Sequence, residues 1–207
     1  MRRILILLAA LAAAPSAVAA CRGPQGLPLP GPSLPLAEGE FRYSSEQGLG
    51  CVVSNQQGVA MAKHESAISF LPCLRVGPVV IGASRAAVEA LLGEPAGVID
   101  LDVFSESRVY EVAQRGTLRP HYVVTYRDEQ VVAVQLVGPP MQIPVRFSGL
   151  TLGDDQQKLI DTLGWPEQRC QGKVDGPQLW TWPSFPIAVD VIDGYVAGFK
   201  VTWPAGK

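Results

Sequence analysis

Charge, aromatic side chains and histidine are all scarce in this chain of 207 residues. Charged residues make up 17% of the sequence and aromatic residues 7%, and there are two histidines. Acidic residues outnumber basic ones, 19 to 17. Because nucleic-acid binding requires a basic face, we exclude nucleic acid as a partner. The same balance argues against electrostatic attraction to an anionic membrane.

The sequence also lacks the motifs of common catalytic and cofactor sites. It has no Gly-x-Ser-x-Gly elbow, no dinucleotide fingerprint and no P-loop. His64 and His121 are too far apart in sequence to suggest a zinc site. The acidic group Asp100, Asp102 and Glu106 offers too few oxygen ligands for calcium and has no central glycine. We therefore expect no catalytic residue, no metal and no cofactor.

Long apolar runs are missing after the first twenty residues, which are typical of an export signal. Arg2 and Arg3 precede an apolar run at 4–14, and Pro15 and small residues at 17–20 follow it. The run is too short to span a bilayer. We expect an exported, periplasmic protein, and removal of Arg2 and Arg3 leaves 15 basic and 19 acidic residues.

Four cysteines in an exported chain predict disulfide bonds. Cys51 and Cys73 lie close along one segment and are the preferred pair. Two interpretations are open for Cys21, which follows the small residues 18–20. It is either the lipidated first residue of an outer-membrane lipoprotein or an unmodified residue after signal cleavage. Cys170 is then free or pairs with Cys21.

One short pattern occurs twice, and the second copy starts 71 residues after the first (153 − 82 = 71). The pattern residues are Gly82, Ser84, Val88, Leu92, Gly93 and Pro95 in the first copy, and Gly153, Asp155, Leu159, Leu163, Gly164 and Pro166 in the second. Ser and Asp are typical helix N-caps, whereas Gly followed by Pro is typical of a helix end. Each copy therefore predicts a short helix.

Strand patterns follow each predicted helix and end in a hairpin. The hairpins cover 122–136 and 187–201, the second with an Asp193-Gly194 turn. The first copy has seven more residues before its hairpin, and we expect this surplus to form a surface loop within 96–121.

The segment before the first copy also contains strand patterns. Residues 51–53 and 58–62 flank the turn-like residues 54–57, and 67–71 are expected to form a third strand.

The predicted fold is α+β, with two tandem repeats of a short helix followed by an antiparallel β-meander. One copy has too little helix to cover its sheet, whereas two copies can share or extend a sheet and bury more of it. The predicted organisation is a signal peptide at 1–20, a Pro/Gly-rich tether at 21–39, a β-hairpin segment at 40–73, a first repeat at 74–138 and a second repeat at 145–203.

The pattern Gly-x-[Ser/Thr]-x-x-x-Val-x-x-x-Leu-Gly-x-Pro followed by a meander resembles the SmpA/OmlA (BamE-like) module of bacterial outer-membrane assembly lipoproteins. Its tandem form resembles the architecture of β-lactamase inhibitor proteins. The resemblance covers residues 74–203, although the first copy has Glu129-Gln130 where the module has Asp-Gly. It implies a non-enzymatic envelope protein that binds another protein. No inhibitor contact residue can be matched, so inhibition of a β-lactamase is not implied.

We expect binding through the sheet face or through the groove between the repeats. The candidate surface residues are Trp180, Trp182, Phe185 and Tyr195. Trp180 and Trp182 project from one face of a strand, and that face is either a protein-binding surface or part of the core.

Two other functions are consistent with the sequence. One is a small-ligand carrier or periplasmic hydrolase that uses Cys73 with His64 or His121. The other is a purely structural protein held at the membrane by a lipid on Cys21.

Overall fold

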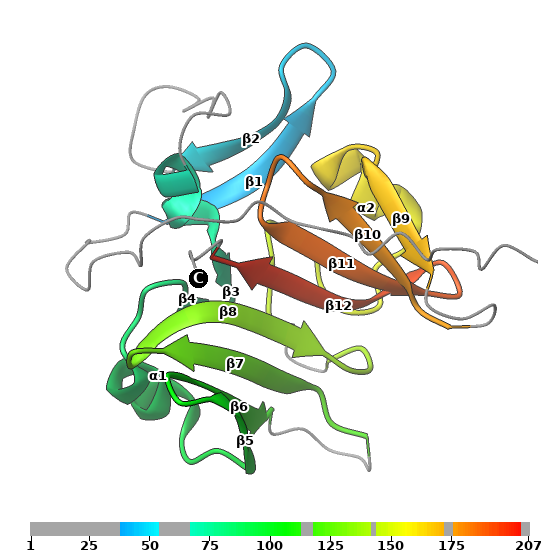
Figure 1. The fold of residues 1–207 in the computed structure, drawn as a ribbon. Coiled ribbons are helices and arrows are strands. Elements are labelled where there is room, and N and C mark those ends of the chain that lie inside the picture. Colours follow the sequence, from blue (N-terminus) through cyan, green and yellow to red (C-terminus); the bar gives the residue numbers. More distant parts are fainter. Residues whose placement is uncertain (1–37, 54–66, 113–117, 142–143, 172–175, 204–207) are drawn as a thin grey trace, which may run out of the picture.

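The computed structural model describes residues 38–53, 67–112, 118–141, 144–171 and 176–203, and an eight-stranded antiparallel sheet dominates it (Figure 1). The strand order is β5-β6-β7-β8-β12-β11-β10-β9. These strands are β5 (Gly97–Asp102), β6 (Ser105–Glu111), β7 (His121–Arg127), β8 (Gln130–Val137), β9 (Gln168–Gln171), β10 (Gln178–Trp182), β11 (Ile187–Ile192) and β12 (Tyr195–Thr202).

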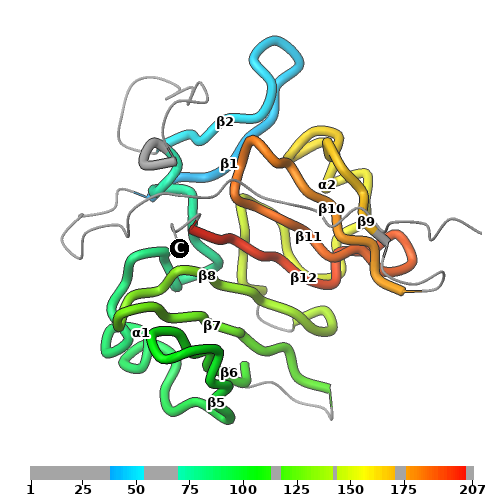
Figure 2. Tube along the Cα trace, in the orientation of Figure 1, coloured from blue at the N-terminus to red at the C-terminus, as the bar shows by residue number. Residues whose placement is uncertain are grey.

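The remaining elements are short. They are β1 (Gly39–Ser44), β2 (Gly48–Val53), the 3-10 helix η1 (Ala67–Cys73), β3 (Arg75–Val76), β4 (Val79–Val80), α1 (Arg85–Leu92) and α2 (Gln156–Leu163). Figure 1 shows α1 beside the β5–β6 end of the sheet and α2 beside the β9–β10 end. Figure 2 shows the Cα trace in the same orientation, with β8 and β12 side by side in the middle. Within the described part of the chain, no helix has the length and apolar character needed to cross a membrane.

The prediction of an α+β fold with two tandem helix-plus-meander repeats is wrong. The described residues form twelve strands and two α-helices of eight residues each, so the protein is mainly β. Strands β5–β8 of the first segment and β9–β12 of the second form one sheet, because β8 pairs with β12 from Val137↔Gly198 to Ala133↔Thr202. This pairing buries two strand edges that separate modules would leave open. The surplus in 96–121 lies mainly between β6 and β7, as predicted: that connection has nine residues (112–120), whereas the one between β10 and β11 has four (183–186).

The predicted helix ends are confirmed. The Ser84 side chain accepts a hydrogen bond from the Ala87 backbone N–H at 3.2 Å, and Asp155 accepts one from Lys158 at 2.8 Å. These bonds satisfy backbone donors that the first helical turn leaves unpaired. Gly164 ends α2 with a φ of 77°, a conformation that L-residues with a side chain rarely adopt.

The N-terminal hairpin differs from the prediction. Its strands are β1 and β2, with the turn at 45–47, whereas the predicted turn at 54–57 and strand at 58–62 lie outside the described residues. Residues 67–71 belong to η1 rather than to a third strand. Pro72 lies inside η1 and cannot donate a backbone hydrogen bond, which disfavours a sheet ladder at this point.

The predicted disulfide between Cys51 and Cys73 is confirmed. The bond joins β2 to the last residue of η1, with the two Cα atoms 5.9 Å apart. Cys170 is also disulfide-bonded, so the interpretation in which it is a free thiol is wrong. Cys21 lies outside the described residues, as do the predicted signal at 1–20 and nearly all of the tether at 21–39.

The core lies on one face of the sheet. Along β7, Tyr122, Val124 and Tyr126 are buried, whereas the alternate residues are half-buried. This period of two is the pattern of a strand with one covered face. The buried hydroxyls of Tyr110 and Tyr126 form a hydrogen bond of 3.0 Å. We call the covered side the inner face and the opposite side the outer face.

Candidate functional site

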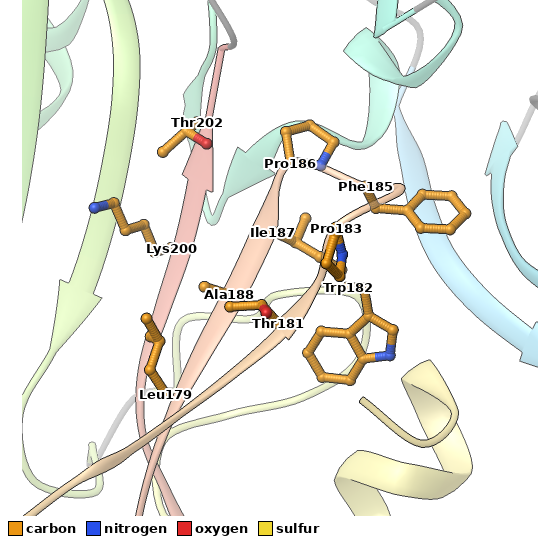
Figure 3. Close-up of a pocket in the computed structure, with 10 residues that line it drawn as sticks. All are labelled: Leu179, Thr181, Trp182, Pro183, Phe185, Pro186, Ile187, Ala188, Lys200 and Thr202. Carbon is orange, nitrogen blue, oxygen red and sulfur yellow. The ribbon is translucent and has the colours of Figure 1, made fainter. Parts of the chain in front are cut away.

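The outer face carries a shallow pocket over β10, β11 and β12 (Figure 3). Its volume is about 210 Å³, and its walls include Leu179, Thr181, Ala188 and Lys200. Lys200 is the one charged residue in the described lining, which contains no carboxylate, histidine or thiol. The pocket therefore lacks the acid–base or nucleophile–base pair that hydrolytic chemistry requires.

Asp190 lies on the same face of β11 and is the partly buried carboxylate of this region. Gln135 Nε2 donates a hydrogen bond of 3.2 Å to Asp190 Oδ2. Burial raises the pKa of Asp190, and the Gln135 hydrogen bond and the Lys200 charge partly oppose this rise. The folded state therefore holds the Asp190 proton more tightly than the unfolded state does.

This difference predicts a pH-dependent effect of Asp190→Asn. A folded pKa above the unfolded value favours folding at low pH, and the advantage is lost as pH rises through the folded pKa. The asparagine variant does not titrate here and so does not lose this stability. We therefore expect the difference in free energy of unfolding, variant minus wild type, to be larger at pH 7 than at pH 4 by roughly 1 kcal/mol or less. Urea unfolding at both pH values measures the difference, and an unchanged difference contradicts the prediction.

The candidate surface residues from the sequence do not form one surface. Trp180 and Trp182 are 1% and 2% exposed, so they belong to the core, and their assignment to a binding surface is wrong. Phe185 is partly buried, and its ring lies 4.9 Å from that of Phe70. Tyr195 is exposed, in the turn region between β11 and β12.

The candidate thiol nucleophile, Cys73, is not free. Cys73 is bound to Cys51 and therefore offers no thiolate. His121 begins β7, and His64 lies outside the described residues. Within the described residues, no group of three or more His, Cys, Asp and Glu side chains is placed to hold a metal ion.

A cluster that the sequence analysis missed lies at the edge strand β5. Six of the eleven exposed large apolar residues in the described part of the chain belong to this region. We call them the β5 edge surface: Val98 (52% exposed), Ile99 (52%), Leu101 (56%), Val103 (88%), Phe104 (65%) and Leu118 (73%). Several exposed apolar side chains along one sheet edge are typical of an interaction surface.

Two hollows adjoin the β5 edge surface. A groove of about 870 Å³ is lined by Ile99, Leu118, Arg119 and other residues of β5, β6 and the start of β7. A hollow of about 380 Å³ lies at the β5–β6 turn and includes Asp100, Phe104 and several charged side chains.

An ion-pair network lies beneath the β5–β6 turn. Glu106 Oε1 is 2.7 Å from Arg108 Nε and 3.3 Å from Arg85 Nε. Arg85 also pairs with Glu129, and Arg108 with Glu89. The network ties β6 to α1 and to the β7–β8 turn, so the strand next to β5 is held in place.

The Asp102 carboxylate stays ionised at the turn. Its Oδ1 accepts a hydrogen bond of 2.8 Å from the Phe104 backbone N–H, and this bond holds the pKa of Asp102 below its usual value. The β5 edge surface therefore combines apolar side chains with fixed negative charge.

The opposite edge of the sheet is different. Strand β9 has four residues, Gln-Arg-Cys-Gln, and its Cys170 is disulfide-bonded. Short, polar edge strands of this kind resist pairing with another chain.

The sequence carries only a partial signal for the β5 edge surface. The adjacent β-branched residues Val98 and Ile99 indicate a strand, but the exposure of that strand depends on strand order, which local patterns do not reveal.

No protein-family model matches this chain, and no curated protein matches it. Among solved structures, it is similar to a cysteine-rich secretory protein (SAV1118) from Staphylococcus aureus, with a TM-score of 0.40 and 15% identity over 67% of this chain and 47% of that one. It is also similar to a DUF4309 family protein (YjgB) from Bacillus subtilis, with a TM-score of 0.40 and 15% identity over 58% of this chain and 78% of that one. The chain thus spans about half the length of the first of these proteins. Neither is an SmpA/OmlA-like protein, and at this TM-score the likenesses carry no argument about function.

Proposed function

We propose that this chain is a non-enzymatic, exported cell-envelope protein that binds another protein through the β5 edge surface. The observation that carries the proposal is the group of six apolar side chains there, each more than half exposed. Burying one large apolar side chain contributes about 1.5–3 kcal/mol, so a few of them suffice for a specific complex. The signal-like first twenty residues support export to the periplasm. Such a protein would serve in envelope assembly or as an inhibitor, and lipidation of Cys21 would anchor it to the outer membrane.

The alternatives have less support. The pocket in Figure 3 has a volume of about 210 Å³, below the range of roughly 300–1,000 Å³ that is usual for small-molecule sites. The hollows of about 870 Å³ and 380 Å³ fall within this range, but both adjoin the β5 edge surface. A thiol-dependent hydrolase would need a free Cys73, which the Cys51–Cys73 bond removes.

A pair of matched variants tests the proposal. Ile99→Ser combined with Phe104→Ser removes two apolar side chains from the β5 edge surface, where both are exposed and the fold is expected to tolerate the changes. We expect retention of the envelope partner on immobilised protein to fall at least about tenfold, because the complex loses the burial of two large apolar side chains.

The control is Ile192→Ser combined with Tyr195→Ser. These residues are also exposed, at 45% and 57%, but lie at the β11–β12 turn. The control is expected to retain the partner as the wild type does. Equal retention by both double variants would show that the β5 edge surface does not bind the partner.

A further inference from the structure

We propose that the partner contributes an extended segment of alternating apolar and basic residues, which pairs with β5 as a ninth strand of the sheet. This inference rests on the proposed function of the same surface. It specifies the mode of binding, which is strand addition, and the chemistry of the partner segment.

The first argument is that each face of β5 carries an exposed apolar side chain. Val98 pairs with Arg108, which pairs with the buried Val124, so Val98 is on the inner face. Ile99 pairs with Ser107, which pairs with Thr125, so Ile99 is on the outer face. Each is 52% exposed.

A helix or a flat protein surface would cover one of these faces and leave the other in water. An added strand covers both, because its own side chains alternate between the two faces of the sheet. Exposure on both faces of one strand therefore favours strand addition over other docking modes.

The second argument is that β5 offers an open backbone edge. It is the first strand in the order of the sheet and pairs only with β6 among the described strands. Its six residues match the usual strand length. Edge strands present unpaired backbone N–H and C=O groups, and proteins normally protect apolar edges against pairing.

The third argument is the charge at the end of β5. The hollow at the β5–β6 turn is lined by five acidic residues and one basic residue: Asp100, Asp102, Glu106, Asp128, Glu129 and Arg85. Glu106 and Glu129 already pair with arginines. Counting the neighbouring Arg108 and Arg127 with Arg85 gives three positive charges against five negative ones, so a net charge of −2 remains (5 − 3 = 2). A partner segment with lysine or arginine complements this charge.

The same charge disfavours a second copy of the chain as the partner. Antiparallel pairing of two β5 strands centred on Leu101 would place Asp100 of each copy opposite Asp102 of the other. Like charges directly opposite each other destabilise a strand pair. In this register the acidic residues disfavour self-association, whereas they complement a basic segment.

A synthetic peptide tests strand addition directly. The probe is an acetylated, amidated peptide of eight residues that alternates valine and lysine, and the readout is amide hydrogen exchange of the full chain with and without a saturating excess of peptide. We expect exchange within 97–104 to slow at least tenfold, because amides that become paired exchange only when the added strand opens. Exchange in β9 is expected to stay unchanged.

Two comparisons test the chemistry. A peptide with glutamate in place of lysine is expected to bind at least tenfold more weakly, and a proline in the centre of the lysine peptide is expected to abolish protection. On the protein, Asp100→Asn combined with Asp102→Asn is expected to weaken binding of the lysine peptide about 2- to 10-fold at low salt. The matched control, Asp161→Asn combined with Asp193→Asn, changes exposed carboxylates far from β5 in sequence and is expected to bind normally.

Each result separates the two proposals. If Ile99→Ser/Phe104→Ser loses the envelope partner but the peptide gives β5 no amide protection, strand addition is overturned while the proposed function stands. If that variant keeps the partner, the proposed function itself fails. Equal binding of the glutamate peptide overturns the basic partner, and dimers with β5 protection in the absence of peptide overturn the argument against a second copy.

Discussion

Replacing Trp180 with alanine is expected to lower the free energy of unfolding by about 3–5 kcal/mol. Trp180 is among the largest fully buried side chains of the described core. The Arg169 guanidinium lies 4.4 Å from its ring centroid, and its Nε1 donates a hydrogen bond of 3.1 Å to Gln178 Oε1. The substitution removes this packing and leaves a cavity that the surrounding strands cannot fill.

Trp165 provides the matched control, because the same Arg169 lies 4.9 Å from its ring while Trp165 is 66% exposed. Trp165→Ala loses a cation–π contact of about 0.5–1 kcal/mol and little buried area. Urea unfolding followed by far-ultraviolet circular dichroism measures both variants. Similar losses for the two substitutions would contradict the assignment of Trp180 to the core.

Local structure could be predicted because short-range chemistry determines it. Ser84 and Asp155 cap their helices because a side-chain oxygen can reach a backbone N–H three residues ahead. Asp193-Gly194 forms the β11–β12 turn with φ values of 51° and 81°, the left-handed region that a two-residue hairpin turn requires. Cys51 and Cys73 pair across a sequence separation of 22 residues.

The sheet as a whole could not be predicted in the same way. Pairing of Val137 with Gly198 joins residues far apart in sequence, and no local pattern identifies the partner of an edge strand. The direction of Trp180 and Trp182 depends on which face the rest of the chain covers. A strand pattern with two aromatic residues on one side is compatible with either face.

The candidate site was missed for the same reason. Asp100, Asp102 and Glu106 drew attention as metal ligands, whereas the neighbouring Val98 and Ile99 carry the apolar exposure. In an internal strand, Val98 and Ile99 would be ordinary core residues. They are exposed because β5 is the outermost strand, a property of the assembled sheet rather than of its sequence.

Removing the Cys51–Cys73 disulfide, by Cys51→Ala combined with Cys73→Ala, is expected to lower the free energy of unfolding by about 3 kcal/mol. The bond closes a loop between residues separated by 22 positions, so its loss restores conformational freedom mainly to the unfolded chain. The sulfurs are also packed in the core, with Cys51 and Cys73 0% and 1% exposed. Urea unfolding without reductant compares the variant with the wild type.

The surroundings of the bond determine how the loss spreads. A Cβ atom on Gly39 would lie 2.8 Å from Cys73 Sγ, so the start of β1 packs directly against the disulfide. The β1–β2 hairpin in turn contacts α2 and buries Phe41 against Phe147. We therefore expect amides of β1 and β2 in the variant to exchange faster than those of β7. If the free energy of unfolding falls by less than about 1 kcal/mol and amide hydrogen exchange in β1 is unchanged, packing around Phe41 holds this hairpin without the disulfide.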